Sequence, residues 1–258
     1  MSSKKLTIGY FYPDLLNLYG DDGNVQILLY RAKARGIDAE VTHINVETEV
    51  TEELMDSLDI IFMGGGPDSS QKGMYRDLLE TKGNYLKEYV EEGGVGLYIC
   101  GSYQLFGKYY KSADGSMLDG LGIFNVYTKH FGNHKPRCIG NVVCEVEEQI
   151  KSDPLFKKIN MVGNTLVGFE NHGGRTYLEK GAQPFAKIVT GHGNNSEDST
   201  EGVIYKNSIG TYLHGPILAR NPHLADYLIA KSLGLEDLDK LDDELIISAH
   251  TASKKLKQ

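Results

Sequence analysis

Residues 94–107 read GVGLYICGSYQLFG and join an apolar, strand-like run to a helix-like run. Cys100 stands at the junction, and Gly101 follows it directly. The first turn of a helix presents unpaired N–H groups and the positive end of the helix dipole, which favour a thiolate and a developing oxyanion. The stretch therefore predicts a strand–turn–helix elbow in which Cys100 is either a buried small residue or a nucleophile.

The first half of the chain alternates between strand-like and helix-like segments around this elbow. Alternation with helices of ten or more residues predicts a parallel sheet covered by helices on both faces. Ligands bind such sheets beyond the carboxyl ends of the strands, where Cys100 and the glycine loop 64–71 (GGGPDSSQ) are expected to lie. The expected strands are 5–12, 38–46, 58–65 and 94–100. The expected helices are 24–34 and 73–92, and an interruption of the second helix at Gly83 stays open.

The second half is less regular and predicts a more antiparallel β region. The expected elements are strands at 122–131, 138–146, 165–171 and 185–191, a hairpin about Lys206–Asn207–Ser208, and a helix over 221–234. The fold class is therefore α/β, with an open, mostly parallel sheet flanked by helices and an additional antiparallel β region in the second half. We expect one domain over 1–235 and a charged C-terminal extension, 236–258, with a short helix and a frayed tail.

Composition narrows the class of function. The formal net charge of −8 argues against nucleic acid as the main partner, because phosphate binding needs a cationic surface. The apolar runs are too short to span a bilayer and no signal peptide is recognised, so a cytoplasmic location is expected. Cys138 and Cys144 are interpreted as buried small residues, and no metal is expected because no cysteine has metal-ligand spacing with a histidine.

A catalytic thiolate needs a base, and two of the eight histidines are candidates. His214 ends the apolar run SIGTYLHGP, which places it at a strand terminus on the edge expected for Cys100. His172, in FENHGGR, competes for the same role. The glycine loop lacks the Lys–Ser/Thr ending of a phosphate-binding P-loop, so a backbone cradle for an oxyanion is the better functional interpretation, with a plain turn as the alternative.

Several motifs resemble one enzyme family. The segment CGSYQLFG is similar to the Cys-Gly-Gly-Tyr-Gln segment of the cobyric-acid-synthase-like branch of class I glutamine amidotransferases, and GTYLHGP resembles the histidine motif of that branch. Three further stretches, 12–25, 168–178 and 212–229, resemble the glutaminase subunits of lipid II isoglutaminyl synthases of Gram-positive bacteria. The resemblance runs from about residue 6 to residue 233 and implies a class I glutamine amidotransferase-like fold.

The resemblance implies a catalytic role for four residues. Cys100 would attack the side-chain amide of glutamine, releasing ammonia and leaving a γ-glutamyl thioester that water hydrolyses. His214 would deprotonate the thiol and protonate the leaving ammonia. The N–H groups of Gly65 and Gly101 would form the oxyanion hole.

The resemblance also implies substrate contacts and a partner. The residues expected to bind glutamine are Gln104, Arg137, Asn171 and Gly173. The implied partner is a MurT-type Mur ligase, which would form a heterodimer with this chain and use ATP and Mg to amidate D-glutamate of the lipid II stem peptide to D-isoglutamine during peptidoglycan biosynthesis. This subunit itself would need no cofactor and would reach lipid II at the inner face of the membrane through the complex.

Two departures from the family pattern stand beside Cys100 and His214. Tyr98 and Ser102 occupy positions where many class I amidotransferases have glycine. The acid that usually stands two residues after the histidine is replaced by Pro216. This agrees with a catalytic dyad of Cys100 and His214. An acid supplied by another loop or by the partner stays open. On that basis the isolated subunit is expected to be weakly active until the partner docks.

Two other functions remain open. The chain could be an amidotransferase subunit for another synthetase, such as a cobyrinic acid amidase. It could also be a non-catalytic scaffold of the amidotransferase type, although the presence of both Cys100 and His214 favours an enzyme.

Overall fold

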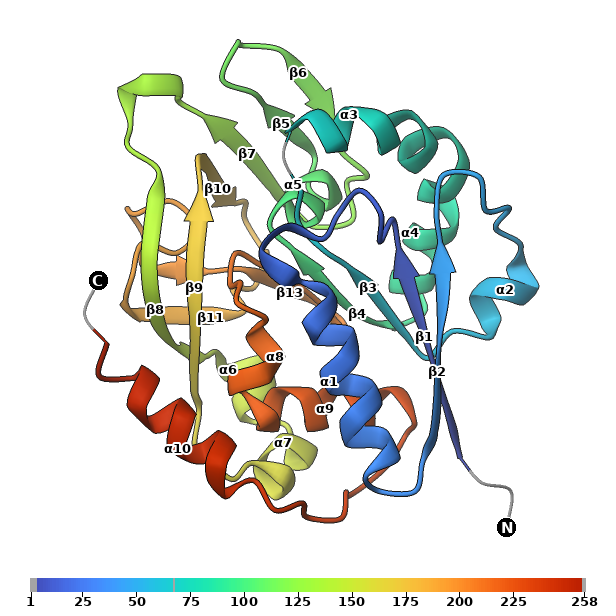
Figure 1. Ribbon diagram of the computed structural model, residues 1–258. Helices are drawn as coiled ribbons and strands as arrows, with labels where there is room; N and C mark the ends of the chain where they lie inside the picture. Colours follow the sequence, from blue (N-terminus) through green and yellow to red (C-terminus); the bar gives the residue numbers. More distant parts are fainter. Residues whose placement is uncertain (1–3, 67, 257–258) are drawn as a thin grey trace.

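The computed structural model describes residues 4–66 and 68–256, and within them the strands form three sheets (Figure 1). Sheet A has six strands in the order β13-β14-β4-β3-β1-β2. All of its neighbours are parallel except the β13–β14 hairpin. Its strands are β1 (Lys5–Phe11), β2 (Asp38–Ile44), β3 (Ile60–Met63), β4 (Val95–Ile99), β13 (Val203–Tyr205) and β14 (Ser208–Thr211).

The two smaller sheets come from the second half of the chain. Sheet B, in the order β10-β7-β5-β6, is built from β5 (Tyr109–Lys111), β6 (Met117–Asp119), β7 (Val126–His130) and β10 (Gly174–Leu178). Sheet C, in the order β12-β11-β8-β9, is built from β8 (Cys138–Val146), β9 (Thr165–His172), β11 (Ala186–Thr190) and β12 (Thr200–Glu201). All pairs in these sheets are antiparallel except β5–β7, which confirms the expected α/β class with an antiparallel region.

Helices cover both faces of sheet A. The connection from β1 to β2 runs toward one edge of sheet A, and the connection from β3 to β4 runs toward the other edge. Because both crossovers are right-handed, helix α1 and helices α3–α4 lie on opposite faces of the sheet. Helix α9 packs beside α1, and both lie in front of the sheet in Figure 1. The helices are α1 (Asp22–Lys33), α2 (Glu52–Asp56), α3 (Asp68–Asp77), α4 (Gly83–Glu91), α5 (Gly101–Phe106), α6 (Glu148–Lys151), α7 (Pro154–Ile159), α8 (Ile217–Arg220), α9 (Pro222–Ser232) and α10 (Glu244–Ser253).

The central strands β3 and β4 are buried along their whole length. Their apolar runs are continuous rather than alternating because both faces of the sheet are covered. Such strands carry no polar face, so function is confined to the loops that leave them. The loops after β1, β3, β4 and β14 all open at the carboxyl edge of sheet A, beside the point where the strand order reverses between β1 and β3.

The expected helix over 73–92 is interrupted before Gly83, which is the alternative that the sequence leaves open. Helix α3 ends at Asp77, a π-helical turn (η2, Leu78–Lys82) follows, and α4 begins at Gly83. A Cβ at Gly83 would lie 2.8 Å from the carbonyl oxygen of Leu78, so only glycine allows this close approach of the two turns.

The C-terminal extension folds back onto the rest of the molecule. Helix α10 contacts α8 and β9, and His250 on it is buried. Pro67 of the glycine loop, residues 1–3, and residues 257–258 of the extension lie outside the described residues. Among the described residues, no helix has the length and apolar character needed to cross a membrane.

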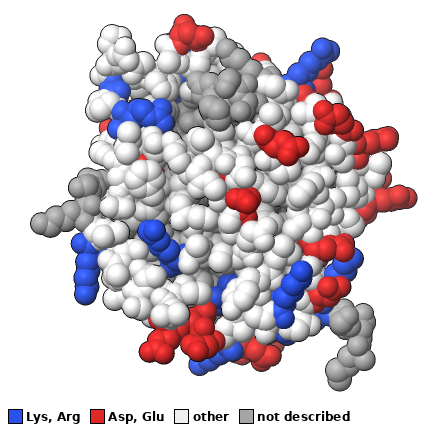
Figure 2. Space-filling model, viewed as in Figure 1, with Lys and Arg blue, Asp and Glu red and all other residues white. Residues whose placement is uncertain are grey.

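Charged side chains are dispersed over the surface seen in Figure 2, where lysines and arginines lie among acidic and uncharged residues.

Candidate active site

Cys100 lies at a tight elbow between β4 and α5. Its backbone has φ 52° and ψ −102°, a strained conformation for a residue with a side chain. Two backbone hydrogen bonds hold it there: the Cys100 N–H donates to the carbonyl of Thr211 at 2.8 Å, and the Gln104 N–H donates to the carbonyl of Cys100 at 3.0 Å. The elbow thus fixes the thiol at the carboxyl edge of sheet A.

Tyr98 and Ser102, which stand where many relatives of the family have glycine, are both accommodated at the elbow. Tyr98 is fully buried against Phe106, with ring centroids 3.9 Å apart, and a Cβ at Gly96 would lie 2.4 Å from the Tyr98 hydroxyl. The missing side chain at position 96 is therefore what makes room for Tyr98. The Ser102 hydroxyl lies 2.7 Å from the Met63 carbonyl oxygen, which links the start of α5 to the end of β3.

His214 is held next to Cys100 by the backbone of β9. Its N–H donates to the carbonyl of Phe169 at 2.7 Å and its carbonyl accepts from the Phe169 N–H at 3.2 Å. A Cβ at Gly65 would lie 3.0 Å from Cys100 Cβ and 3.1 Å from His214 Cε1, so the three residues share one small space. His214 is 1% exposed, and its Nε2 has no hydrogen-bond partner among the described residues.

Asp21 supplies the carboxylate that the histidine motif lacks. Its Oδ1 lies 3.2 Å from His214 Nδ1, and its Oδ2 accepts the Gly65 N–H at 2.8 Å. Burial of the imidazole lowers the pKa of His214, but the negative charges of Cys100 and Asp21 outweigh burial and raise that pKa above its usual range. The acid therefore comes from another loop, one of the sources that the sequence leaves open.

Contacts between the start of α1 and the segment after His214 place Asp21. A Cβ at Gly23 would lie 2.3 Å from Pro216 Cγ, so the glycine lets the proline ring pack against α1. The buried Asn24 side chain accepts the Leu218 N–H at 3.0 Å. These residues bring positions separated by 193 residues in sequence into contact at the site.

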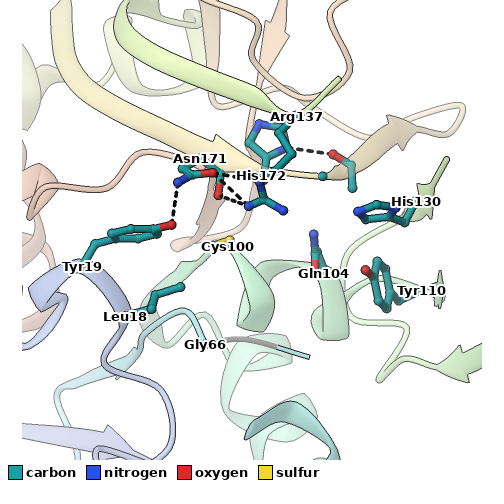
Figure 3. A pocket seen from close by; sticks show the side chains of 12 residues that line it. Leu18, Tyr19, Gly66, Cys100, Gln104, Tyr110, His130, Arg137, Asn171 and His172 are labelled. Atoms are coloured by element: carbon teal, nitrogen blue, oxygen red, sulfur yellow. Dashed lines mark hydrogen bonds between the residues drawn. The ribbon is translucent and has the colours of Figure 1, made fainter. Parts of the chain in front are cut away.

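The elbow borders a pocket of about 340 Å³ (Figure 3). Cys100 lies between Leu18 and Tyr19 on one side and Gln104, Tyr110 and His130 on the other, while Arg137 and Asn171 reach in from the ends of β8 and β9. The pocket is lined by Leu18, Tyr19, Gly66, Cys100, Gln104, Tyr110, His130, Arg137, Asn171, His172, Gly173 and Gly174.

The four residues expected to bind substrate all line this pocket. Arg137 donates to Asn171 Oδ1 from Nε at 3.0 Å and from Nη2 at 2.9 Å, and Gln104 Nε2 donates to the Tyr212 hydroxyl at 3.1 Å. A Cβ at Gly173 would lie 2.0 Å from His130 Nε2, so this glycine allows the histidine ring to form the pocket wall. Their contact with a substrate stays a prediction.

The two expected oxyanion donors differ in their surroundings. Gly101 begins α5 directly after the thiol. The Gly65 N–H donates to Asp21, so in this geometry it is already engaged. Its role as an oxyanion donor stays a prediction that requires this hydrogen bond to shift.

His172 is less suited than His214 to act as the base. Its Nδ1 lies 2.7 Å from the Gly174 carbonyl oxygen, and its ring stacks on Tyr212 with centroids 3.7 Å apart. Burial lowers the pKa of His172, which disfavours the protonated form that would donate to a leaving group. His214, with the Asp21 carboxylate on its Nδ1, has the opposite environment.

The described residues contain no group of three or more His, Cys, Asp and Glu side chains placed to hold a metal ion. The thiol, the imidazole and the Asp21 carboxylate form an arrangement that suits acyl transfer from an amide.

Comparisons with known proteins agree with this geometry. A model of the CobB/CobQ-like glutamine amidotransferase domain matches residues 7–222. The lipid II isoglutaminyl synthase (glutamine-hydrolyzing) subunit GatD of Staphylococcus aureus is 45% identical over 228 residues, 88% of this chain and 84% of the relative. The subunit of the same name from Streptococcus pneumoniae is 38% identical over 229 residues, 89% of this chain and 81% of the relative.

Among solved structures, a chain of PurLQS from Thermotoga maritima is similar in fold. It superposes with a TM-score of 0.57 at 15% sequence identity, covering 90% of this chain and 96% of that one. At this identity the likeness supports the fold alone.

Proposed function

The chain belongs to the CobB/CobQ-like glutamine amidotransferase family, and from this premise we propose that it is the glutamine-hydrolysing subunit of a lipid II isoglutaminyl synthase. The observation that carries the chemistry is the contact set of Cys100, His214 and Asp21 at the carboxyl edge of sheet A. The extent of the similarity to the two GatD subunits supports the specific assignment over another synthetase.

Hydrolysis proceeds in two steps. The Cys100 thiolate attacks the side-chain carbonyl carbon of glutamine, and protonated His214 gives its proton to the leaving nitrogen, so that ammonia departs and a γ-glutamyl thioester remains. His214 then takes a proton from water, which attacks the thioester to give glutamate and free thiol. Asp21 holds the imidazole ring and stabilises its protonated form in both steps.

Substrate recognition uses the opposite wall of the pocket. The Arg137 guanidinium uses Nε and Nη2 on Asn171 and is suited to the α-carboxylate of glutamine. Gln104 and Gly173 lie on the same pocket and complete the expected glutamine-binding set. The Gly101 N–H, one residue after the thiol at the start of α5, would receive the oxyanion.

The ammonia is used on a second chain. A MurT-type Mur ligase would bind ATP and Mg, activate the D-glutamate carboxylate of the lipid II stem peptide and form D-isoglutamine. Complex formation would place this subunit at the cytoplasmic face of the membrane. The sequence predicts weak activity of the isolated subunit because no acid follows His214. Since Asp21 orients His214 within this chain, we expect instead that the isolated subunit hydrolyses glutamine measurably.

The test is glutamine hydrolysis by the purified chain, followed as glutamate and ammonia. Wild type is expected to be active and Cys100→Ala inactive, whereas Cys144→Ala, a change to a buried thiol in β8 of sheet C, is expected to retain activity. Addition of the Mur ligase partner, ATP and lipid II is expected to give isoglutamine-containing lipid II. Equal hydrolysis by wild type and Cys100→Ala would exclude the proposed nucleophile, and an absence of hydrolysis alone and in the complex would favour a scaffold.

A further inference from the structure

Tyr19 lies where the catalytic and substrate-binding parts of the pocket meet. It belongs to the short 3-10 turn η1 (Leu18–Gly20) between β1 and α1, and it lines the pocket. Figure 3 shows its side chain extending toward Asn171, on the side of the pocket away from His130.

The hydroxyl of Tyr19 anchors the side chain of Asn171. It accepts a hydrogen bond of 2.6 Å from Asn171 Nδ2, while Asn171 Oδ1 accepts from Arg137. A flipped Asn171 amide would turn its NH2 group toward the donor-only guanidinium and lose both Arg137 contacts, whereas the Tyr19 hydroxyl can accept from or donate to the amide. Arg137 therefore selects the amide orientation, and the Tyr19 hydroxyl holds the far end of the amide in place, which limits where the guanidinium can point.

The ring of Tyr19 contacts His214. The two rings meet edge to face, with centroids 4.9 Å apart and planes at 72°. Asp21 holds the same imidazole through Nδ1, so the ring is restrained by a hydrogen bond and by an aromatic contact. Loss of the Tyr19 ring would remove one of these two restraints. The imidazole would then be less well oriented toward the Cys100 thiol.

The backbone keeps Tyr19 in place at a conformational cost. Its φ of 58° is in the left-handed region that favours glycine, and the neighbouring Leu18 N–H donates to the carbonyl of Gly65 at 2.9 Å. The side chain is 43% exposed, unlike the fully buried Tyr12 at the start of the same loop. A half-exposed side chain held in a strained turn contributes little to the core, which points to a role in the pocket.

We propose that Tyr19 is a positioning residue for glutamine hydrolysis, with its hydroxyl aligning the Asn171–Arg137 pair for the α-groups of glutamine and its ring aligning His214 for the thiol. This inference rests on the proposed function and deepens it. The two contributions come from different atoms of one side chain, so two substitutions separate them.

Steady-state glutaminase kinetics of two variants test the proposal. Tyr19→Phe keeps the ring and removes the hydroxyl, so KM for glutamine is expected to rise about five- to ten-fold, the loss of one hydrogen bond, with a smaller effect on kcat. Tyr19→Leu removes the ring as well, so kcat is also expected to fall and its pH profile to shift. Tyr30→Phe, at a 62% exposed site on α1, is the matched control and is expected to match wild type.

Covalent labelling of Cys100 separates alignment from general damage. The glutamine-like electrophile 6-diazo-5-oxo-L-norleucine carries the α-amino and α-carboxylate groups, whereas iodoacetamide carries neither. Tyr19→Phe is expected to slow labelling by the diazo compound about five-fold or more relative to iodoacetamide, as read by peptide mass at Cys100. Circular dichroism and the thermal midpoint are expected to equal those of wild type.

The outcomes distinguish this inference from the function on which it rests. If wild-type Cys100 hydrolyses glutamine and reacts with the diazo compound, but Tyr19→Phe shows the same KM and the same labelling ratio, the role of the hydroxyl is overturned and the function stands. If Tyr19→Leu retains the wild-type kcat and pH profile, the role of the ring is overturned. If wild type neither hydrolyses glutamine nor reacts, the function and the inference fall together.

Discussion

Asp21 contributes to the charge of the catalytic pair. Burial lowers the pKa of His214, the negative charge of Cys100 raises it, and the Asp21 carboxylate on His214 Nδ1 raises it further. Asp21→Asn keeps the shape of the side chain and removes its charge, so the pKa of His214 is expected to fall and less of the imidazole is protonated at neutral pH. Because the protonated imidazole must give its proton to the leaving ammonia, kcat is expected to fall on the order of 10²-fold.

An NMR titration of His214 checks the direction of this change. The imidazole of wild type is expected to stay protonated to a higher pH than that of Asp21→Asn. The neighbouring Asp22→Asn, which makes the same change in net charge one residue away, is the control and is expected to titrate as wild type. Identical His214 midpoints in wild type and Asp21→Asn would show that the carboxylate does not set this pKa.

The residues that the sequence could predict are those carried by local patterns. Cys100 follows an apolar run, His214 ends one, and Gln104, Arg137 and Asn171 lie in or beside recognisable motifs, and the structure brings all five to one site. Asp21 and Tyr19 were missed as site residues although both lie in the stretch YPDLLNLYGDDGNV. Their contacts with His214 and Asn171 span 193 and 152 positions, which no local pattern encodes.

At the scale of the element, the elbow depends on the strand that precedes it. Tyr98 occupies the space that a side chain at position 96 would take, since a Cβ there would lie 2.4–2.6 Å from the tyrosine ring and hydroxyl. Gly96→Ala is expected to lower the free energy of unfolding by about 1–3 kcal/mol, because β4 and its neighbours are close-packed. Chemical denaturation measures it.

Gly73→Ala is the matched control for that change. Gly73 lies exposed in α3, where an added methyl group meets little and alanine favours the helix, so the free energy of unfolding is expected to be unchanged or slightly higher. Two equally stable variants would mean that Tyr98 moves to accept a side chain at position 96.

Some element boundaries were predicted closely. The expected strand 138–146 matches β8, and the predicted turn about Lys206–Asn207–Ser208 connects β13 to β14, which begins at Ser208. An interruption at Gly83 was left open by the sequence, but the π-helical form of the break at Leu78–Lys82 was not predicted, because one extra residue in a turn barely alters the 3.6-residue period. The short strands β5, β6 and β10 were also missed, since β5 and β6 have only three residues each and β10 pairs with β7, which lies far before it in the chain.

At the scale of the whole molecule, a buried ion cluster links the first helix to the C-terminal segment. Arg31 on α1 is 1% exposed, and its guanidinium donates to both carboxylate oxygens of Asp226 and of Asp243 at 2.6–2.7 Å. Arg35 adds a bond to Asp226 and another to the carbonyl of Asp239. Charge composition alone suggests an extension after residue 235, whereas these contacts favour one folded unit that includes Asp243.

Truncation after residue 235 tests whether the extension belongs to the folded unit. It removes Asp243 and α10, which leaves the buried Arg31 guanidinium with half of its carboxylate partners. Because breaking a buried ion pair costs about 3–5 kcal/mol, the truncated chain is expected to unfold at a markedly lower temperature or to remain insoluble. Asp243→Asn is expected to lower the thermal midpoint by less, since the amide oxygen still accepts from Arg31. Removal of residues 256–258 alone is the control and is expected to leave the thermal midpoint of the full chain unchanged. A 1–235 chain with the full midpoint and full glutaminase activity would show instead that the domain ends there, and that the cluster on Arg31 is satisfied by Asp226 and water.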